Sequence, residues 1–147
     1  MPMTREQMDQ VVTEHFMYEA MDNIEGVLGS LVADAEHEMV PSPMGGALHN
    51  ADQIRAFYNM LFADIKGEDV TPVRRLYGDT FMVDEAIWHG RVENGRSFGC
   101  AGKSGKVSFR ILHVFEFRDG KISRENVWCD IAAIQQQLGV TALAASS

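Results

Sequence analysis

The chain has 147 residues, of which 46% are hydrophobic and 23% are charged, a composition typical of one globular domain with its own core. Its 13 lysines and arginines against 21 aspartates and glutamates give a net charge of −8. This argues against nucleic-acid or anionic-membrane partners, because phosphate-binding surfaces need a basic excess. The two cysteines, Cys100 and Cys129, cannot build a disulfide framework, and we see no signal-peptide pattern. We therefore expect a single domain over residues 1–147, cytoplasmic and with reduced thiols.

The first half of the chain shows mainly helical spacing of its apolar residues. Thr4 and Gln7 form a capping-box pair ahead of the first helix. Asn50 is a typical N-cap for the clearest amphipathic segment, which Gly67 should end. The predicted elements are a helix over 4–21, a short helix around 27–32, a strand over 35–40 that runs into a Pro/Gly loop, and a helix over 50–67.

The second half is predicted to be mostly strand. Asp119 and Gly120 are a strong hairpin-turn signal between two alternating segments. The longest alternation places one row on a single face: Val107, Phe109, Ile111, His113, Phe115 and Phe117. The predicted elements are strands over 70–76, 80–92, 107–118 and 121–130, a helix over 131–138 and a frayed tail over 140–147.

This order of elements predicts an α+β domain with an antiparallel sheet and its helices on one face. The other face of the sheet also carries apolar residues, among them Leu112 and Val114. Apolar residues there suggest a second layer, most simply another copy of the chain. We therefore expect a homodimer that forms through the sheet.

Motifs for phosphate, metal or nucleophilic sites are not supported by their context. The segment 101–104, Ala-Gly-Lys-Ser, lacks the leading glycine of a phosphate-binding loop and precedes a strand. His37 and Glu38 begin like a zinc-protease motif, but Pro41 stands where its second histidine would be. The cysteines lack zinc-ligand spacing. We expect neither a metal nor a cofactor.

The strongest candidate site lies on the two strands of the last hairpin. His113 interrupts a row of phenylalanines, where a histidine must be paired or face a cavity. On the return strand, Asn126, Trp128 and Asp130 share one face by the two-residue period. Asp130 would lie in water-poor surroundings that suit a general acid or base. His113 and Asp130 are therefore the predicted catalytic pair.

Each of these residues also has a purely structural explanation. His113 could be a core histidine bonded to the backbone, and Asp130 directly precedes a helix, where aspartate is a preferred N-cap. Trp88 and Trp128 could fill the core. Glu38 is either a second candidate carboxylate or part of a solvated strand edge. The sequence leaves these alternatives open.

Six short segments occur in an order that is informative as a set: 30–34 (Ser-Leu-Val-Ala-Asp), the strand that ends at Pro41, 52–58, 114–122, 127–130 and 137–139. Together they resemble the nuclear transport factor 2-like superfamily and, within it, the SnoaL-like polyketide cyclases. The resemblance covers nearly the whole chain. It implies a curved sheet that helices wrap into a cone, with an apolar pocket and usually a dimeric state.

The resemblance can be carried over only residue by residue. Val40 and Phe16 stand where ketosteroid isomerases have their base aspartate and oxyanion tyrosine. Asp130 matches the final aspartate of limonene-epoxide hydrolases, but the arginine and second aspartate of those enzymes are missing. SnoaL-like cyclases pair a histidine on the long strand with an aspartate on the next strand. His113 fits that histidine, and the aspartate aligns a few residues before Asp130, near Val127.

The predicted function is therefore cofactor-free acid–base chemistry, as in a cyclase, isomerase or dehydratase, on a hydrophobic carbonyl compound. Asp130 would remove a proton next to the carbonyl, and His113 would stabilise or reprotonate the enolate. The alternatives are a binding protein without catalysis and an interaction subunit that uses its open sheet face. The residues expected to bind the small molecule are Trp128, Trp88, Phe16, Glu38, Val40, Phe57 and Phe115.

Overall fold

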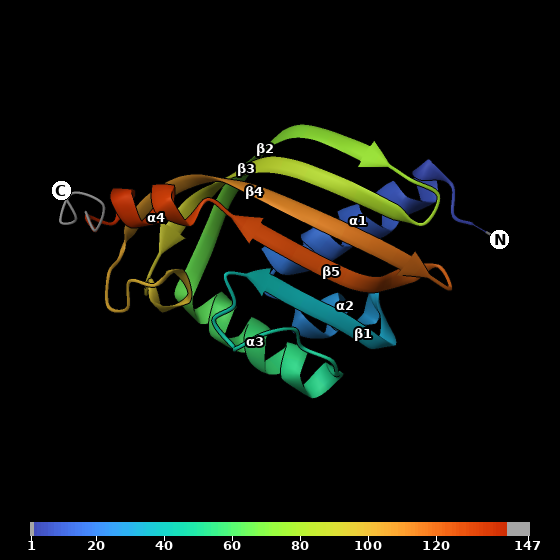
Figure 1. Cartoon of the computed structure of the whole chain (residues 1–147), viewed down its shortest axis with the longest axis horizontal. Helices are drawn as coiled ribbons and strands as arrows, with labels where there is room; N and C mark the ends of the chain where they lie inside the picture. Colours follow the sequence, from blue (N-terminus) through green and yellow to red (C-terminus); the bar gives the residue numbers. More distant parts are fainter. Residues whose placement is uncertain (1, 141–147) are drawn as a thin grey trace.

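The structure of the chain is a computed structural model that describes residues 2–140 (Figure 1). From residue 141 onward, the predicted frayed tail lies outside the described residues. The helices of the described part are α1 (Arg5–Ala20), α2 (Ile24–Gly29), α3 (Ala51–Asp64), a 3₁₀ turn at Arg96–Phe98 and α4 (Ile131–Gln137). The strands are β1 (Leu31–Val40), β2 (Ile65–Tyr77), β3 (Phe81–Val92), β4 (Gly105–Arg118) and β5 (Lys121–Cys129).

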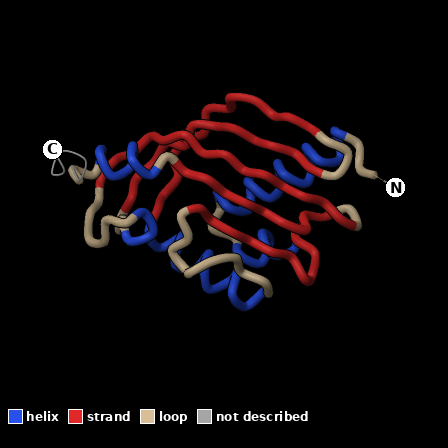
Figure 2. Tube along the Cα trace, in the orientation of Figure 1, coloured by secondary structure: helices blue, strands red, loops and turns tan. Residues whose placement is uncertain are grey.

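The strands form one five-stranded sheet in the order β1-β5-β4-β3-β2 (Figure 2). Strands β2 to β5 pair antiparallel with their neighbours, as the hairpin signals predict. β1 instead runs parallel to β5, with His37 opposite Glu125. The sheet is therefore mixed, and the expectation of a wholly antiparallel sheet is wrong at this one edge. The parallel pairing brings residues from the first third of the chain beside its last strand.

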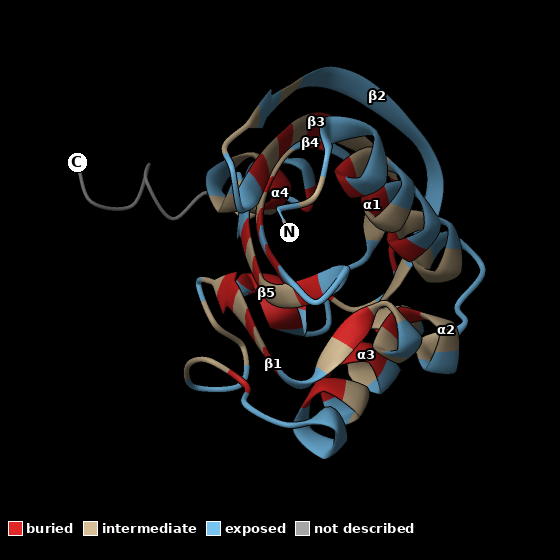
Figure 3. Cartoon of the chain, turned by 90° about the vertical axis from the view of Figure 1, so that its right-hand side faces the viewer, coloured by how far each residue is buried: buried red, intermediate tan, exposed pale blue. Residues whose placement is uncertain are grey.

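The sheet is curved, and α1, α2 and α3 lie against its concave face (Figure 3). In this end-on view β2 arches over α1 at one edge, while α3 lies below β1 at the other. The core between the layers includes Met8 and Val12 of α1, Phe57 of α3 and Phe109 of β4. This arrangement confirms an α+β fold with the long helices on one face. Among the helices of the described part, none has both the length and the apolar character needed to cross a bilayer.

Side-chain caps set the starts of the helices. The Thr4 hydroxyl accepts from the Gln7 N–H at 3.1 Å, and the Gln7 side chain accepts from the Thr4 N–H at 2.8 Å, which completes the predicted capping box. Asn50 caps α3 by accepting from the Gln53 N–H at 2.9 Å.

Two predicted boundaries moved because strand pairing overrode local signals. α3 ends at Asp64, and Gly67, which was expected to end the helix, lies inside β2 and pairs with Gly90 of β3. β1 begins at Leu31, where a helix was expected, and this residue pairs with Ile122 of β5. In both cases a long-range partner that the local sequence does not reveal decides the conformation.

Candidate functional site

A cavity of about 410 Å³ lies between the concave face of the sheet and the helices α1 and α3. Its walls are mainly aromatic and aliphatic, and its lining also includes six carboxylates and two histidines. A cavity of this size and lining suits a small apolar ligand held by a few polar contacts. Four of the residues proposed from the sequence line this cavity: His113, Trp88, Phe16 and Phe57.

Phe115 lies beside His113 on the same face of β4. It is fully buried and stacks on His113, with ring centroids 5.4 Å apart and an angle of 2° between the planes. Phe16 packs edge-on against the same imidazole at 5.0 Å. The aromatic pair thus fixes the plane of the His113 ring in the cavity wall.

The remaining expected ligand contacts lie on the outer face of the sheet. Glu38 accepts hydrogen bonds from Arg124 at 3.0 Å and from Asn126 at 3.1 Å, so it belongs to an outer polar network. Trp128 is 38% exposed, and Val40 is its partner in the neighbouring strand. Of the two roles left open for Glu38, the structure shows the second: Glu38 is part of a partly solvated strand edge and is not a carboxylate of the cavity.

Asp130 is the N-cap of α4 and does not meet His113. Its carboxylate accepts a hydrogen bond from the Ala133 N–H at 3.1 Å, and the residue is exposed. The reason is a bulge in the β4–β5 hairpin: Phe117 pairs with Ile122, but Glu116 pairs with Arg124. A shift of one residue turns every later side chain of β5 to the other face.

The carboxylate that faces His113 comes from the other neighbouring strand. Asp84 of β3 stands directly opposite His113 of β4, a register that places the two Cβ atoms about 4.5–5.5 Å apart. Both side chains line the cavity and are buried, at 8% and 6% exposure. Nδ1 of His113 has no hydrogen-bond partner within the described part of the chain. An imidazole and a carboxylate so placed can both reach a bound molecule.

Arg75 of β2 holds Asp84 in place. Its Nε donates to Oδ2 of Asp84 at 2.8 Å, and its Nη1 donates to Asp9 of α1 at 2.8 Å. The Tyr77 hydroxyl also donates to Asp9, at 2.7 Å. Burial acts to raise the pKa of Asp9, but these donors together hold that pKa below its usual value. One guanidinium therefore serves two carboxylates.

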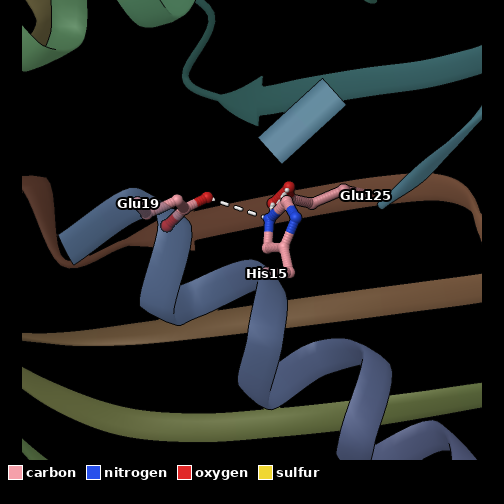
Figure 4. A group of neighbouring side chains, drawn as sticks. All are labelled: His15, Glu19 and Glu125. Carbon is pink, nitrogen blue, oxygen red and sulfur yellow. Dashed lines mark hydrogen bonds and ion pairs between the residues drawn. The ribbon is translucent and has the colours of Figure 1, made fainter. Parts of the chain in front are cut away.

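A second polar group is buried where α1 faces β5 (Figure 4). Nε2 of His15 lies 2.9 Å from Oε1 of Glu19 and 3.0 Å from Oε1 of Glu125. The Tyr58 hydroxyl lies 2.9 Å from Glu19 and 3.1 Å from Glu125. Because a phenol has one proton, it donates to one carboxylate at a time. We call these four residues the buried cluster.

The position of Ser30 shows how His15 is protonated. The Ser30 hydroxyl donates to the Val27 carbonyl, so it accepts from Nδ1 of His15 at 2.8 Å. Nε2 then needs its own proton to face two carboxylates, and His15 is an imidazolium. Burial alone would lower the pKa of His15, but the charges of Glu125 and Glu19 outweigh it and raise the pKa to about 10. Burial acts to raise the pKa of Glu125, and His15 reverses this and lowers it strongly.

His37 lies beside the buried cluster and also lines the cavity. Its Nε2 is 3.7 Å from Oε1 of Glu125, and its Nδ1 has no hydrogen-bond partner within residues 2–140. Burial lowers the pKa of His37 despite the nearby Glu125 charge, so this ring is neutral. Burial and the two carboxylates raise the pKa of Tyr58, which keeps the phenol protonated as a donor.

His15, Glu19 and Glu125 could in principle hold a metal ion, because their ligand atoms lie within 4.8 Å of one another. The distances of 2.9 and 3.0 Å between Nε2 and the two carboxylates are those of hydrogen bonds. A metal would have to displace the proton that His15 carries at Nε2. The geometry therefore favours a proton over a metal at this place.

Sequence reasoning missed Asp84, His15, His37 and Glu125. A usable signal existed for all four, because each interrupts an apolar face, as His113 does and as His37 does between Ala35 and Met39. Glu125 alternates with Val127, His15 follows Val12 within a helical stripe, and Asp84 alternates with buried neighbours. A buried polar residue inside an apolar row is a stronger signal than the hairpin position that singled out Asp130.

The chain matches one family model and is similar to several solved structures. The family model described as SnoaL-like polyketide cyclase matches residues 12–138. A search of the curated proteins found no match. The chain is similar in structure to TsrD from Streptomyces laurentii, with a TM-score of 0.77, 16% identity and coverage of 95% of this chain and 99% of that one.

Two further solved structures extend the comparison. One is a protein with a ketosteroid isomerase-like fold from Catenulispora acidiphila, in complex with trimethylamine, with a TM-score of 0.72, 16% identity and coverage of 90% and 94% of the two chains. The other is an NTF2-like protein from Burkholderia pseudomallei, with a TM-score of 0.71, 20% identity and coverage of 92% and 99%. At these identities the likeness establishes the fold.

Proposed function

Because the chain belongs to the SnoaL-like polyketide cyclase family, we propose that it is a cofactor-free enzyme that performs acid–base chemistry on a hydrophobic carbonyl compound. The observation that carries this proposal is the pairing of His113 and Asp84 in the wall of an apolar cavity. Groups fixed in such a cavity interact strongly with charge that develops during a reaction. Cyclisation, isomerisation and dehydration of carbonyl compounds share an enolate, which needs a base and a donor to its oxygen.

In this proposal Asp84 is the base. It takes the proton from the carbon next to the carbonyl, and the electron pair of that C–H bond moves into the enolate. His113 donates a hydrogen bond to the enolate oxygen, where the negative charge develops. Arg75 is a positioning residue, since its contact with Oδ2 sets the direction of the Asp84 carboxylate.

Cys129 is a candidate nucleophile for covalent catalysis, and its surroundings argue against that role. It lines the cavity, so a thiolate there could attack a bound carbonyl. Burial raises the pKa of the Cys129 thiol to about 12. The thiol is therefore protonated at neutral pH and is a poor nucleophile.

The experiment that tests the proposal needs no knowledge of the natural substrate. The protein is incubated in D₂O with a panel of hydrophobic cyclic ketones, and loss of the α-proton signals is followed by NMR. We expect the protein to accelerate exchange for ketones that bind, because removal of the α-proton is the step we assign to Asp84. Heat-denatured protein at equal concentration is the control. Bound ketones whose exchange stays at the control rate would contradict the proposal.

The alternative is a binding protein without catalysis. It is favoured by one observation: Asp84, Glu19 and Glu125 are all engaged by neighbouring donors, which stabilises them as fixed charges. The similar structure in complex with trimethylamine supports the view that proteins of this fold hold small molecules. In the exchange experiment, binding without any acceleration is the result that selects this alternative.

We also propose that the chain forms a homodimer through the outer face of its sheet. Leu112 and Trp128 are partners on that face, and Val114 follows Leu112 two residues along β4. We expect sedimentation velocity to give the mass of a dimer, and Trp128→Glu to shift it to a monomer with an unchanged circular dichroism spectrum. A monomeric wild-type protein at micromolar concentration would contradict this.

A further inference from the structure

The charged side chains that line the cavity, among the described residues, are acidic. Among the described residues that line it there are six carboxylates and neither a lysine nor an arginine. The carboxylates are Glu19, Asp22, Glu68, Asp69, Asp84 and Glu125. Low-dielectric walls focus the field of such charges into the space between them. A ligand that carried a carboxylate or phosphate would be repelled there.

The cations behind the wall do not balance these charges. In the buried cluster, the single positive charge of His15 faces two carboxylates, Glu19 and Glu125. In the other group, the single guanidinium of Arg75 faces Asp84, which lines the cavity, and Asp9, whose side chain is 42% exposed and does not line it. The buried cluster therefore keeps one carboxylate in excess beside the cavity. An unbalanced charge beside an apolar cavity is unfavourable, and a cation in the cavity would offset it.

Acidic residues at the cavity's edge continue the pattern. Lys66 lies 3.6 Å from Asp22, and Lys106 lies 3.9 Å from Glu68. All four side chains are about half exposed or more, so water and salt weaken these pairs. Against these two lysines the edge carries three carboxylates, Asp22, Glu68 and Asp69, so its net charge is negative and attracts an approaching cation.

The apolar walls are also suited to a cation. Phe16, Phe57, Phe62 and Trp88 present aromatic rings to the cavity, and ring faces attract cations. His37 is 2% exposed, lines the cavity and leaves Nδ1 without a partner in the described part. When neutral with its proton on Nε2, it can accept a hydrogen bond from an ammonium N–H. This unpartnered atom is a second sign, independent of the carboxylates, that a polar ligand group is missing.

We propose that the ligand of this cavity is a hydrophobic organic cation, that is, a carbonyl compound which also carries a protonated amine or a quaternary ammonium group. The inference rests on the proposed function in taking this cavity as the ligand site and in taking Asp84 and His113 as the groups that meet the carbonyl. The buried cluster holds the cation, and the pair of Asp84 and His113 meets the carbonyl end. Anionic substrates such as acyl phosphates or carboxylates are excluded from the site.

The test compares three probes of similar size that differ in charge. N-methylbenzylamine is cationic at pH 7, benzyl methyl ether is its neutral counterpart, and phenylacetate is an anion. Binding to the full chain is measured by calorimetry and by saturation-transfer NMR. We expect the cation to bind about tenfold or more tightly than the ether, which corresponds to one cation–π contact together with the carboxylates. Phenylacetate should bind more weakly than the ether.

The variant Glu19→Gln tests whether the buried cluster causes the preference for the cation. Glu19→Gln keeps a hydrogen-bonding side chain beside His15 and Tyr58, and its residue is the less buried of the two glutamates, so the fold should survive. We expect this change to bring the affinity for the cation close to that for the ether. Glu14→Gln, on the exposed side of the same helix, is the matched control. It should change neither the affinity for the cation nor the affinity for the ether.

The outcomes separate the inference from the proposed function. Equal affinity for cation and ether, or tighter binding of phenylacetate, overturns the inference and leaves the cavity as a site for neutral molecules. A cation preference that survives Glu19→Gln overturns the assignment to the buried cluster. Failure of all three probes to bind overturns both the inference and the use of this cavity as a ligand site.

Discussion

Replacing His113 by alanine is expected to slow α-proton exchange on a bound ketone by about 10²–10⁴-fold, the range that one general acid–base group contributes. The enolate oxygen would lose its donor in a cavity with little water to replace it. Asp84→Asn should cost a similar factor, because an amide cannot take up the proton. Rates are measured by NMR in D₂O at saturating ketone, so that the change is assigned to the chemical step and not to binding.

Asp130→Asn is the matched comparison, with the same change of chemical group on a different carboxylate. Asparagine is also a good N-cap, so α4 should keep its start. We expect full exchange activity from this variant. The reverse pattern, with Asp130→Asn inactive and Asp84→Asn active, would return the catalytic role to the residue that the sequence first suggested.

Glu125→Gln is expected to lower the free energy of unfolding by about 1–3 kcal/mol, because His15 and Tyr58 lose a buried charged hydrogen-bond acceptor while Glu19 still balances the imidazolium. The imidazolium of His15 would keep only Glu19 as its counter-charge. The measurement is chemical denaturation at pH 6. Glu38→Gln on the adjacent strand is the control, since Glu38 pairs with Arg124 at the partly exposed outer face. There the loss should stay below about 1 kcal/mol.

The pH profile gives a second readout for the same variant. The pKa of His15 rises on folding from 6.5 to about 10, so its contribution is complete below pH 6.5 and is lost as the pH rises toward 10. The pKa of Glu125 falls on folding from 4.5, so its contribution is complete above that pH and is lost in acid. We expect wild-type stability to be highest between about pH 5 and 6.5. Glu125→Gln should flatten both sides, and an unchanged profile would show that the ion pair does not form.

Much of the fold could be predicted because local signals and periodicity agree. The turn at Asp119 and Gly120 forms where the sequence predicts it, with φ of 54° and 76°. The parallel pairing of β1 with β5 could not be predicted, because nothing in the sequence of either strand indicates which distant strand it pairs with. Helix ends moved for the same reason, as at Gly67, which a sheet partner drew into β2.

At the candidate site, the sequence predicts which residues of β5 share a face but not which face points toward His113. The alternation correctly placed Asn126 and Trp128 on one face of β5, and Asp130 follows the strand as the N-cap of α4. Which face this is depends on the register with β4, and a regular two-residue hairpin would have turned them toward the side of His113. A single bulge beside Glu116 reversed this and put Glu125 in the interior instead. A bulge of one residue leaves no clear trace in composition or spacing, so the outward placement of Asp130 could not be predicted.

The order of the strands in the sheet also determines when the fold can be completed during synthesis. His15 and Glu125 are 110 positions apart, and β1 has its sheet partner only in the last strand. Chains are made from the N-terminus at about 5–20 residues per second, so α1 waits several seconds on the ribosome with a polar residue in its apolar stripe. The cavity can form only after β5 has left the exit tunnel, because β5 supplies part of its wall. A nascent chain stalled before that point would expose both the apolar stripe of α1 and the edge of β1 that later pairs with β5.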